Sequence, residues 1–412
     1  MKSQTLNQSS NHPKLNSRSY MKRVFISITI MHFTVYWFIG IFLLFVFFSD
    51  IFTSSIYNIA GLDFRSMESL QAIMRVDISQ IYAESSPEPF LNLPSAMIYV
   101  FLWSIVRDFF PSFSMLQFLT IFDLNLFIWN VINCILIGKI VNLKRVQDFL
   151  GNSIFRNPYV VMSIYMAVGF HYWAYFIGSH DIEVAFFVLL GLHEYMRGKE
   201  RFAFFYWGIG IIFKITVGFF VLFFLIPGTL KNALKNIGST LIPHISTALI
   251  FLRWPSLIGD FLSSNTAMVT GGFTFGWGQP GNIPVYLFSW FQVPILYTIV
   301  ILACIFLPLN LFITIEFKDK LHPIEKSVMI ILLVFNCVTP FWSTHVIIFL
   351  GPFLIWFGKT NTDLSKCKMN LIKFLIFIPL FFSILWLIYP AIPFHIIGAL
   401  VYLDIMFLAR KR

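Results

Sequence analysis

Long runs of hydrophobic residues, separated by short polar stretches, recur along the chain from Val24 to Leu408. The runs do not alternate polar and apolar positions as the strands of a transmembrane barrel do. In a bilayer, segments of this kind satisfy their backbone amides by forming helices. The pattern therefore predicts an all-α protein, a polytopic transmembrane bundle of about 11–12 spans.

The positions of the expected spans follow from the ends of these runs. The first run, 24–48, is longer than the core of a signal peptide, so we interpret it as a retained first span after a tail at 1–23. A membrane module at 24–358 is followed by a C-terminal hairpin with a basic tail at 359–412. A fourth span is expected to end at Arg197. The other spans are expected near 115–138, 159–177, 238–252, 283–315, 328–340, 345–358, 371–389 and 392–409.

The charges give these spans an orientation. Hydrophobic residues make up 58% of the chain and charged residues 12%, with a formal net charge of +10. Lys and Arg concentrate in short segments between the runs, as the positive-inside rule describes for cytoplasmic loops, so both termini are expected in the cytoplasm. No basic stripe with interleaved aromatic residues indicates nucleic-acid binding. We expect a cell-membrane protein, with the endoplasmic reticulum membrane as the alternative.

The segment 50–114 is expected to form an outer loop. It contains six acidic residues against two arginines as far as residue 92. The stretch 93–110 is apolar but short and begins next to Pro94. Counting it as a span would move the basic stretch 139–156 to the outside. We therefore expect this stretch to form a helix in the outer interface.

The apolar stretch 202–228 carries Lys214 near its middle and has basic loops at both ends. A single crossing would violate the charge rule, whereas two half-spans that meet near Lys214 satisfy it. A lysine at a helix centre costs about 2.5–3.5 kcal/mol on insertion scales, so Lys214 needs an anion. The anion is either an interior carboxylate, such as Asp123 or Glu183, or the phosphate of a lipid-linked substrate.

Two further groups of acidic residues are candidates for chemistry. Asp63 follows the first span at the outer edge of the membrane, and Asp77 is its rival; the ordinary alternative for both is a solvated loop carboxylate. His180, Asp181 and Glu183 begin the fourth span. Acids are favoured there by the helix dipole, which is the main interpretation, and a metal site is the weaker one.

The segment 253–283 is expected to be a long outer loop. Its glycine- and aromatic-rich part, 271–282, includes Gln279 and suits stacking against a sugar. It equally suits an interfacial loop, where Trp is enriched. Arg253 is placed where an outer-face phosphate could reach it. The sequence contains no nucleotide-binding loop, nucleophile elbow or zinc motif, and the four cysteines lack metal-ligand spacing.

Three stretches, covering about half of the chain, together resemble the GT-C superfamily of polyprenyl-phosphate-sugar-dependent glycosyltransferases. The closest likeness is to its polyprenol-phosphate-mannose-dependent mannosyltransferases, of the GPI mannosyltransferase I type. The chain has Asn92-Leu93-Pro94 where that family usually has Tyr-Pro-Pro. The stretches are Asp63 through Asp77 to Pro94, Asn157-Pro158 through Gly178–Glu183 to Gly208–Lys214, and Thr339-Pro340-Phe341 to Gly351-Pro352.

The resemblance implies a hexosyltransferase that moves mannose from a polyprenyl-phosphate sugar donor to a hydroxyl of a glycan or lipid acceptor, with inversion. It needs no cofactor and no obligatory metal. Asp63 would be the general base. Substrate-binding roles are expected for Lys214, Arg253, Asp77, His180, Asp181 and Gln279. Two alternatives stay open: a transporter or flippase of a lipid-linked or hydrophobic solute, and a non-catalytic subunit of a glycosylation complex.

Overall fold

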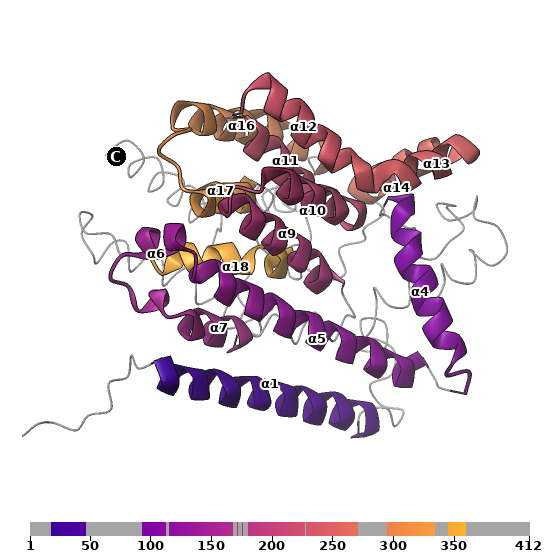
Figure 1. The fold of residues 1–412 in the computed structure, drawn as a ribbon. Coiled ribbons are helices and arrows are strands. Elements are labelled where there is room, and N and C mark those ends of the chain that lie inside the picture. Colours follow the sequence, from indigo (N-terminus) through magenta and orange to yellow (C-terminus); the bar gives the residue numbers. More distant parts are fainter. Residues whose placement is uncertain are drawn as a thin grey trace, which may run out of the picture.

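The computed structural model describes residues 18–46, 93–112, 115–167, 171, 175, 180–226, 228–270, 295–333 and 345–359. All regular structure in these ranges is helical (Figure 1), which confirms the all-α prediction for this part of the chain. Asp63, Asp77 and Gln279 lie outside the described residues, as do the spans expected at 371–389 and 392–409.

The first half of the described chain contains α1 (Arg18–Val46), η2 (Pro94–Ala96), α4 (Met97–Asp108), α5 (Met115–Val141), α6 (Lys144–Leu150), η3 (Ile154–Arg156), α7 (Pro158–Ala167) and α9 (Asp181–Met196). The second half contains α10 (Glu200–Phe213), η4 (Ile215–Val217), α11 (Gly218–Leu225), α12 (Leu230–Leu241), η5 (Ile242–His244), α13 (Ile245–Arg253), α14 (Ser256–Thr270), α16 (Ile295–Glu316), α17 (Pro323–Leu333) and α18 (His345–Phe357).

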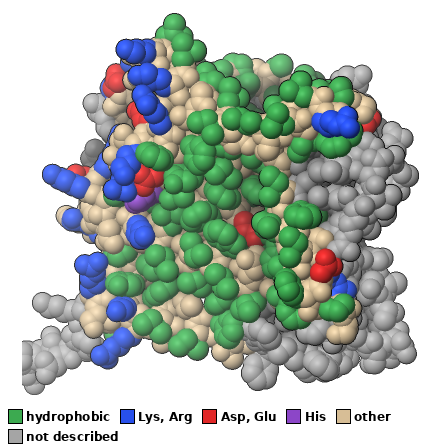
Figure 2. Space-filling model, turned by 45° about the vertical axis from the view of Figure 1, so that its right-hand side comes forward, with side chains coloured by type: hydrophobic (Ala, Val, Ile, Leu, Met, Phe, Trp, Pro, Cys, Tyr) green, Lys and Arg blue, Asp and Glu red, His purple; other side chains and the backbone are tan. Residues whose placement is uncertain are grey.

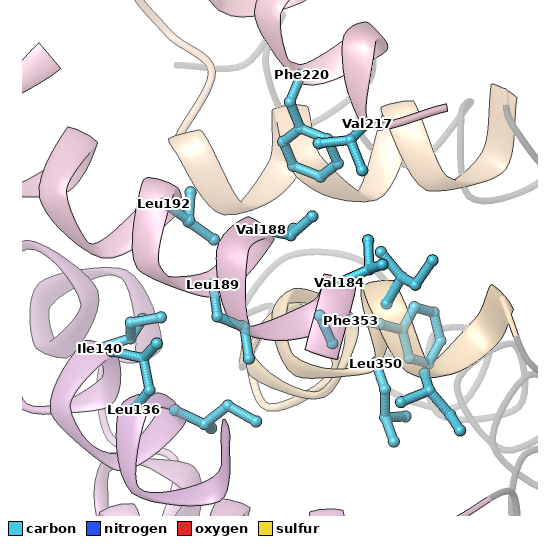
Figure 3. Close-up of a cluster of buried hydrophobic side chains, with 14 of the residues drawn as sticks. Leu136, Ile140, Val184, Val188, Leu189, Leu192, Val217, Phe220, Leu350 and Phe353 are labelled. Carbon is cyan, nitrogen blue, oxygen red and sulfur yellow. The ribbon is translucent and has the colours of Figure 1, made fainter. Parts of the chain in front are cut away.

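Helix α9 occupies the centre of the bundle and packs against α5, α10 and α18. Apolar residues surround it on nearly all sides, which is the pattern of a helix buried within a bundle. Figure 3 shows the resulting core, in which side chains of α5, α9, η4, α11 and α18 meet. The labelled members of this core are Leu136, Ile140, Val184, Val188, Leu189, Leu192, Val217, Phe220, Leu350 and Phe353.

Two glycines allow α10 to approach its neighbours closely. A Cβ atom on Gly191 of α9 would lie 2.3 Å from Nε1 of Trp207, which donates to the carbonyl of Val188. A Cβ atom on Gly208 would lie 2.5 Å from the carbonyl oxygen of Thr240 in α12. Both contacts are shorter than a side chain permits, so these positions require glycine for packing.

The antiparallel pair α9 and α10 defines two ends of the bundle. Gly198, at φ +76°, turns the chain between the two helices. Asp181 and Lys214 consequently lie at one end, across which α4 runs in Figure 1; we call it the α4 end. The opposite end holds Arg145, Arg197, Lys199 and Lys326, and we call it the basic end. Figure 2 shows Lys and Arg gathered along one edge, with hydrophobic side chains over the adjoining surface.

Among the described residues, one helical stretch, Ile121–Val141 in α5, is long and apolar enough to cross a membrane by itself. A second candidate arises only if Leu230–Arg253 and Ser256–Ser263 are counted as one span, although the helix axis bends by 110° between them. Large apolar side chains nevertheless face outward along several helices, including Ile98, Phe101 and Leu102 of α4, each 55% exposed.

Several expected boundaries are confirmed and two are wrong. A helix does occupy 93–110, and the helix expected over 202–228 is interrupted at Lys214. Helix α1 begins at Arg18, within the segment interpreted as the tail. The segment 253–283 begins with α14 rather than a loop, because Leu257 and Phe261, one turn apart, pack against the core. The helix expected at 238–252 begins at Leu230 and is interrupted by η5.

Candidate functional site

The break at Lys214 is the most irregular feature of the described bundle. Helix α10 ends at Phe213, and Lys214 is extended, with φ −146° and ψ 109°, before the short η4. The β-branched residues around it, Ile212 and Ile215 among them, have a low helix propensity. The backbone N–H of Leu93 donates to the carbonyl of Ile212 at 3.2 Å. The segment that leads into α4 is thereby bonded to the end of α10.

Lys214 forms an ion pair with Asp181. Its Nζ lies 3.1 Å from Oδ1 of Asp181, whose side chain is 0% exposed, while 21% of the Lys214 side chain is exposed. An interior carboxylate therefore does lie against Lys214, but the expected residues, Asp123 and Glu183, were wrong. Asp181 takes this place because it begins α9, and α9 packs antiparallel to α10. The end of one helix thus meets the beginning of the other.

Glu183 forms a second buried cluster two residues beyond Asp181, on the same helical turn. Its Oε1 accepts hydrogen bonds from the Tyr99 hydroxyl of α4 and from Nδ2 of Asn125 in α5, the latter at 2.7 Å. The glutamate is only 6% exposed. These bonds connect α4 and α5 to the start of α9. Sequence reasoning missed both donors, although a polar Asn125 inside an apolar helix was an available signal.

An aromatic surface covers the ion pair. Phe213 directly precedes Lys214. The centroid of its ring lies 5.7 Å from that of Tyr99, in an edge-to-face arrangement, and 6.1 Å from that of Phe187, in a stacked arrangement. The His180 ring lies 6.4 Å from the same phenylalanine. His180 precedes α9 at the N-cap position without forming a side-chain cap bond. The polar groups of the site are therefore enclosed by large apolar side chains, which strengthens their electrostatic interactions.

Arg253, the remaining described candidate, lies apart from the ion pair. It ends α13, is exposed, and places its guanidinium 5.5 Å from the centroid of the Trp254 ring. The start of α13 packs against η2, where Oγ of Ser95 and of Ser246 are 2.9 Å apart. Helix α13 therefore belongs to the α4 end, but the described contacts of Arg253 are with Trp254 and not with Lys214.

The residues at the start of α9 do not form a metal-ligand set. Among the described residues, no group of three or more His, Cys, Asp and Glu side chains could hold a metal ion. Asp181 pairs with Lys214, and Glu183 accepts from Tyr99 and Asn125, so the two carboxylates point to different partners. The helix-terminus interpretation of these acids is confirmed, because both lie in the first turn of α9.

Comparison with protein-family models, with curated proteins and with solved structures finds no match to this chain. The chemistry of the site is therefore argued from its own residues. A lysine that keeps its charge through a buried carboxylate can bind a phosphate group with its other N–H bonds. The site thus offers a cation, two carboxylates and an aromatic surface, all at the end crossed by α4.

Proposed function

We propose that this protein is a multi-pass integral membrane glycosyltransferase. It would move a hexose, mannose in the first instance, from a polyprenyl-phosphate donor to an acceptor hydroxyl on the non-cytoplasmic face. One observation carries the proposal: Lys214, at the break between α10 and α11, is held against the fully buried Asp181 at the end opposite the basic end. A phosphate anchored there would lie at the border between hydrocarbon and water.

Three features support placement in a membrane. Hydrophobic residues make up 58% of the chain, and its mean hydropathy is +0.79. Outward-facing apolar side chains cover much of the surface in Figure 2, and the Lys and Arg side chains gather at one edge of it. Under the positive-inside rule the basic end is cytoplasmic and the α4 end faces outside. In this proposal the bundle has about 11–12 spans, some contributed by residues beyond the described ranges, and both termini are cytoplasmic.

Helix α4 supports the interfacial part of the proposal. It lies across the end of the bundle, at a steep angle to α1 and α5 (Figure 1). Val100 and Trp103 are buried against the bundle, whereas Phe101 and Leu102 are exposed. A helix with one face on the protein and an apolar face outward suits the boundary between headgroups and acyl chains. Tyr99 connects this helix to Glu183, so α4 also covers the proposed site.

The reaction would proceed as a displacement at the anomeric carbon. The acceptor hydroxyl attacks that carbon and gives its proton to the carboxylate of Asp63, while the bond from the carbon to the phosphate oxygen breaks. The polyprenyl phosphate leaves as an anion, and Lys214, held in place by Asp181, stabilises it. Attack opposite the phosphate inverts the configuration. No step requires a metal or a redox partner.

The test is incubation of the purified protein with radiolabelled polyprenyl-phosphate mannose and a lipid extract. We expect label in a new product, and a loss of transfer in Asp63→Asn of the size of a general-base contribution, about 10²–10⁴-fold. Lys214→Met should raise the donor concentration needed for half-maximal transfer. Lys235→Met is the matched control, because this lysine is exposed on α12.

The outcomes separate the alternatives. Undiminished turnover in Asp63→Asn would remove this residue as the base. Equal donor dependence in Lys214→Met and Lys235→Met would reject the phosphate contact. Movement of the labelled donor across a vesicle bilayer without any new product would instead favour the transporter or flippase alternative.

A further inference from the structure

The basic end contains a buried lysine that no carboxylate neutralises. Lys326, in α17, is 5% exposed, and its Nζ lies 5.9 Å from the centroid of the Phe224 ring of α11. Within the described ranges, no carboxylate oxygen lies within ion-pair distance of this Nζ. A buried charge without a counter-charge is unfavourable, so this position favours an anion, and the described residues place none against it.

The packing of α6 on α17 brings a second cation toward Lys326. The ring of Phe149 in α6 stacks on His322, with centroids 4.3 Å apart. Arg145 lies one turn before Phe149 on the same face of α6, and Lys326 lies one turn after His322. The two cations therefore lie on either side of the stacked rings, near enough for the charge of Arg145 to act on Lys326.

The electrostatics agree with this geometry. Lys326 precedes the span expected at 328–340, and burial together with the charge of Arg145 lowers its pKa to about 8. Arg145 is exposed and forms no ion pair with a described acid. Two positive charges held at one place repel each other until an anion bridges them.

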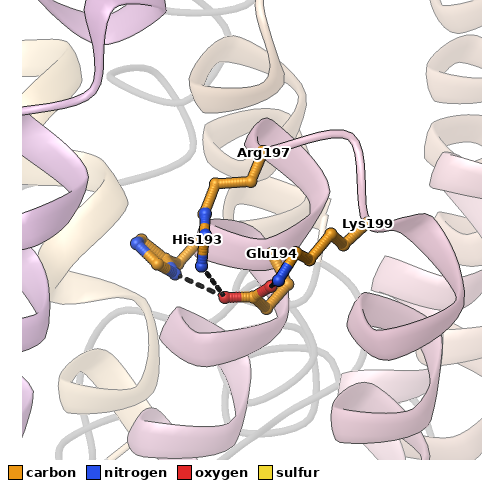
Figure 4. A network of polar contacts seen from close by, with 4 residues as sticks. All are labelled: His193, Glu194, Arg197 and Lys199. Atoms are coloured by element: carbon orange, nitrogen blue, oxygen red, sulfur yellow. Dashed lines mark hydrogen bonds and ion pairs between the residues drawn. The ribbon is translucent and has the colours of Figure 1, made fainter.

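The acids of this end are engaged elsewhere. Figure 4 shows Glu194 surrounded by a histidine and two cations: its Oε1 lies 2.9 Å from Nδ1 of His193 and 3.1 Å from a guanidinium nitrogen of Arg197, and its Oε2 lies 3.8 Å from Nζ of Lys199. Asp319 attracts Lys326 from beyond ion-pair distance.

Two other acids of this end have donors of their own. Glu325 pairs with Lys359 at 2.8 Å and accepts the backbone N–H of His322. Glu200 accepts from Asn236 at 3.2 Å. Among the described residues, therefore, none of the ion pairs involves Lys326.

A hydroxyl completes the set of donors. The ring of Tyr195 packs edge-on against Phe224, with centroids 4.7 Å apart, on the same phenylalanine that Lys326 approaches. Arg145 acts electrostatically on the Tyr195 hydroxyl as well as on Lys326. A lysine, an arginine and a tyrosine hydroxyl from α17, α6 and α9 thus surround one location, which is the donor chemistry that phosphate oxygens accept.

We propose that Lys326, Arg145 and Tyr195 form a phosphate-binding site at the basic end, separate from the site at Lys214. Its ligand is a phosphate group, presented either by the headgroup of an anionic phospholipid or by a small soluble phosphate. The ordered ligand would neutralise the buried lysine and hold α6 against α17. This proposal does not depend on glycosyl transfer.

The experiment measures the thermal unfolding midpoint of the full-length protein in two kinds of nanodisc. In phosphatidylcholine nanodiscs, inorganic phosphate is titrated against sodium chloride of equal ionic strength. In a second series, phosphatidylglycerol replaces part of the phosphatidylcholine without added phosphate. We expect the midpoint to rise with the logarithm of ligand concentration in at least one series, as mass action requires. A rise in the first series identifies a small-phosphate site, and a rise in the second alone identifies a lipid headgroup.

Variants make the assignment specific. Lys326→Met should abolish the rise, and without the anion its midpoint should equal or exceed that of the wild type, because a buried charge is gone. Lys326→Arg should keep the rise. Arg145→Gln, at an exposed position, should weaken apparent affinity about tenfold or more. Lys235→Met, exposed on α12, is the control and should behave as the wild type does.

Three results would overturn the proposal. The first is a midpoint that phosphate and phosphatidylglycerol leave unchanged. The second is an equal rise with sodium chloride, which would indicate charge screening alone. The third is a rise that survives in both Lys326→Met and Arg145→Gln. None of these readouts measures transfer, so this site and the proposed transferase activity can fail independently.

Discussion

The two ends of the bundle each bury a lysine, and they satisfy it in different ways. At the α4 end, Lys214 pairs with the fully buried Asp181, so the chain supplies its own counter-charge. At the basic end, Lys326 is 5% exposed, and the nearby charges of Arg145 and of the more distant Asp319 act on it without forming an ion pair. A lysine paired internally is a fixed part of the fold, whereas one without an ion pair among the described residues is where we propose a ligand. The comparison teaches that burial alone does not tell which role a charged residue has.

The largest expected effect comes from removing the internal partner. Asp181→Asn leaves Lys214 without its counter-charge, and breaking a buried pair in this way should lower the free energy of unfolding by roughly 3 kcal/mol. Thermal unfolding in detergent followed by circular dichroism measures the loss. The double variant Asp181→Asn with Lys214→Met should recover part of it. If the double variant loses as much as the sum of the single ones, the two residues are not coupled.

The second effect concerns the neighbouring acid at the α4 end. Tyr99→Phe removes one of the two hydrogen bonds to Glu183 while keeping the aromatic ring, and removing a donor from a buried acceptor costs about 1–3 kcal/mol. We expect a loss in this range from the unfolding midpoint and the enthalpy of unfolding. Tyr206→Phe, on α10, is the matched control. Equal midpoints for the two variants would mean that the bond to Glu183 contributes little.

The third effect is a pH dependence at the basic end. Burial, followed by the charge of Arg145, lowers the pKa of His322 to about 3. In the unfolded chain a histidine has a pKa of about 6.5, so acidification protonates the unfolded state first, and stability falls as the pH drops below that value. Between pH 7.5 and 5.5 the loss should be at most about 1.4 kcal/mol.

The control for this prediction is His322→Gln. The variant loses the ring stacking on Phe149, which changes its absolute stability. The quantity to compare is therefore the slope of the free energy of unfolding against pH. We expect a shallower slope in the variant over this range. Identical slopes would show that His322 does not carry the pH dependence.

The smallest effect sharpens the comparison most. In neutral lipid without phosphate, Lys326→Met should change the free energy of unfolding by no more than about 1 kcal/mol, and any change should be stabilising. Lys214→Met, in contrast, leaves Asp181 buried and unpaired and should destabilise. Chemical unfolding of both variants under one set of conditions compares them directly. A marked loss in Lys326→Met would mean that its charge has an internal partner after all.

Local features of the chain predicted much of the helical framework. The end of α10 at Lys214 was expected from a charge in an apolar stretch, and the helix α4 from an apolar stretch too short to span. The acids at the start of α9 follow from the helix dipole. These are properties of neighbouring residues in sequence, which hydrophobic periodicity and charge record directly. The helix α14 was not predicted because its sequence contains glycine and serine, as loops do. Its helical form depends on the packing of Leu257 in the core, which the sequence does not show.

The sequence by itself determined that Lys214 must meet an anion, because a lysine in an apolar stretch cannot remain without one. Only the tertiary structure decided that this anion is Asp181 rather than Asp123 or Glu183, because the choice depends on which helix ends the antiparallel packing of α9 and α10 brings together. Lys326 attracted no attention in the sequence, where it looks like one more cytoplasmic lysine. Its burial arises from the packing of α17 on α18, α11 and α16, and contacts between segments so far apart in the chain leave no local trace.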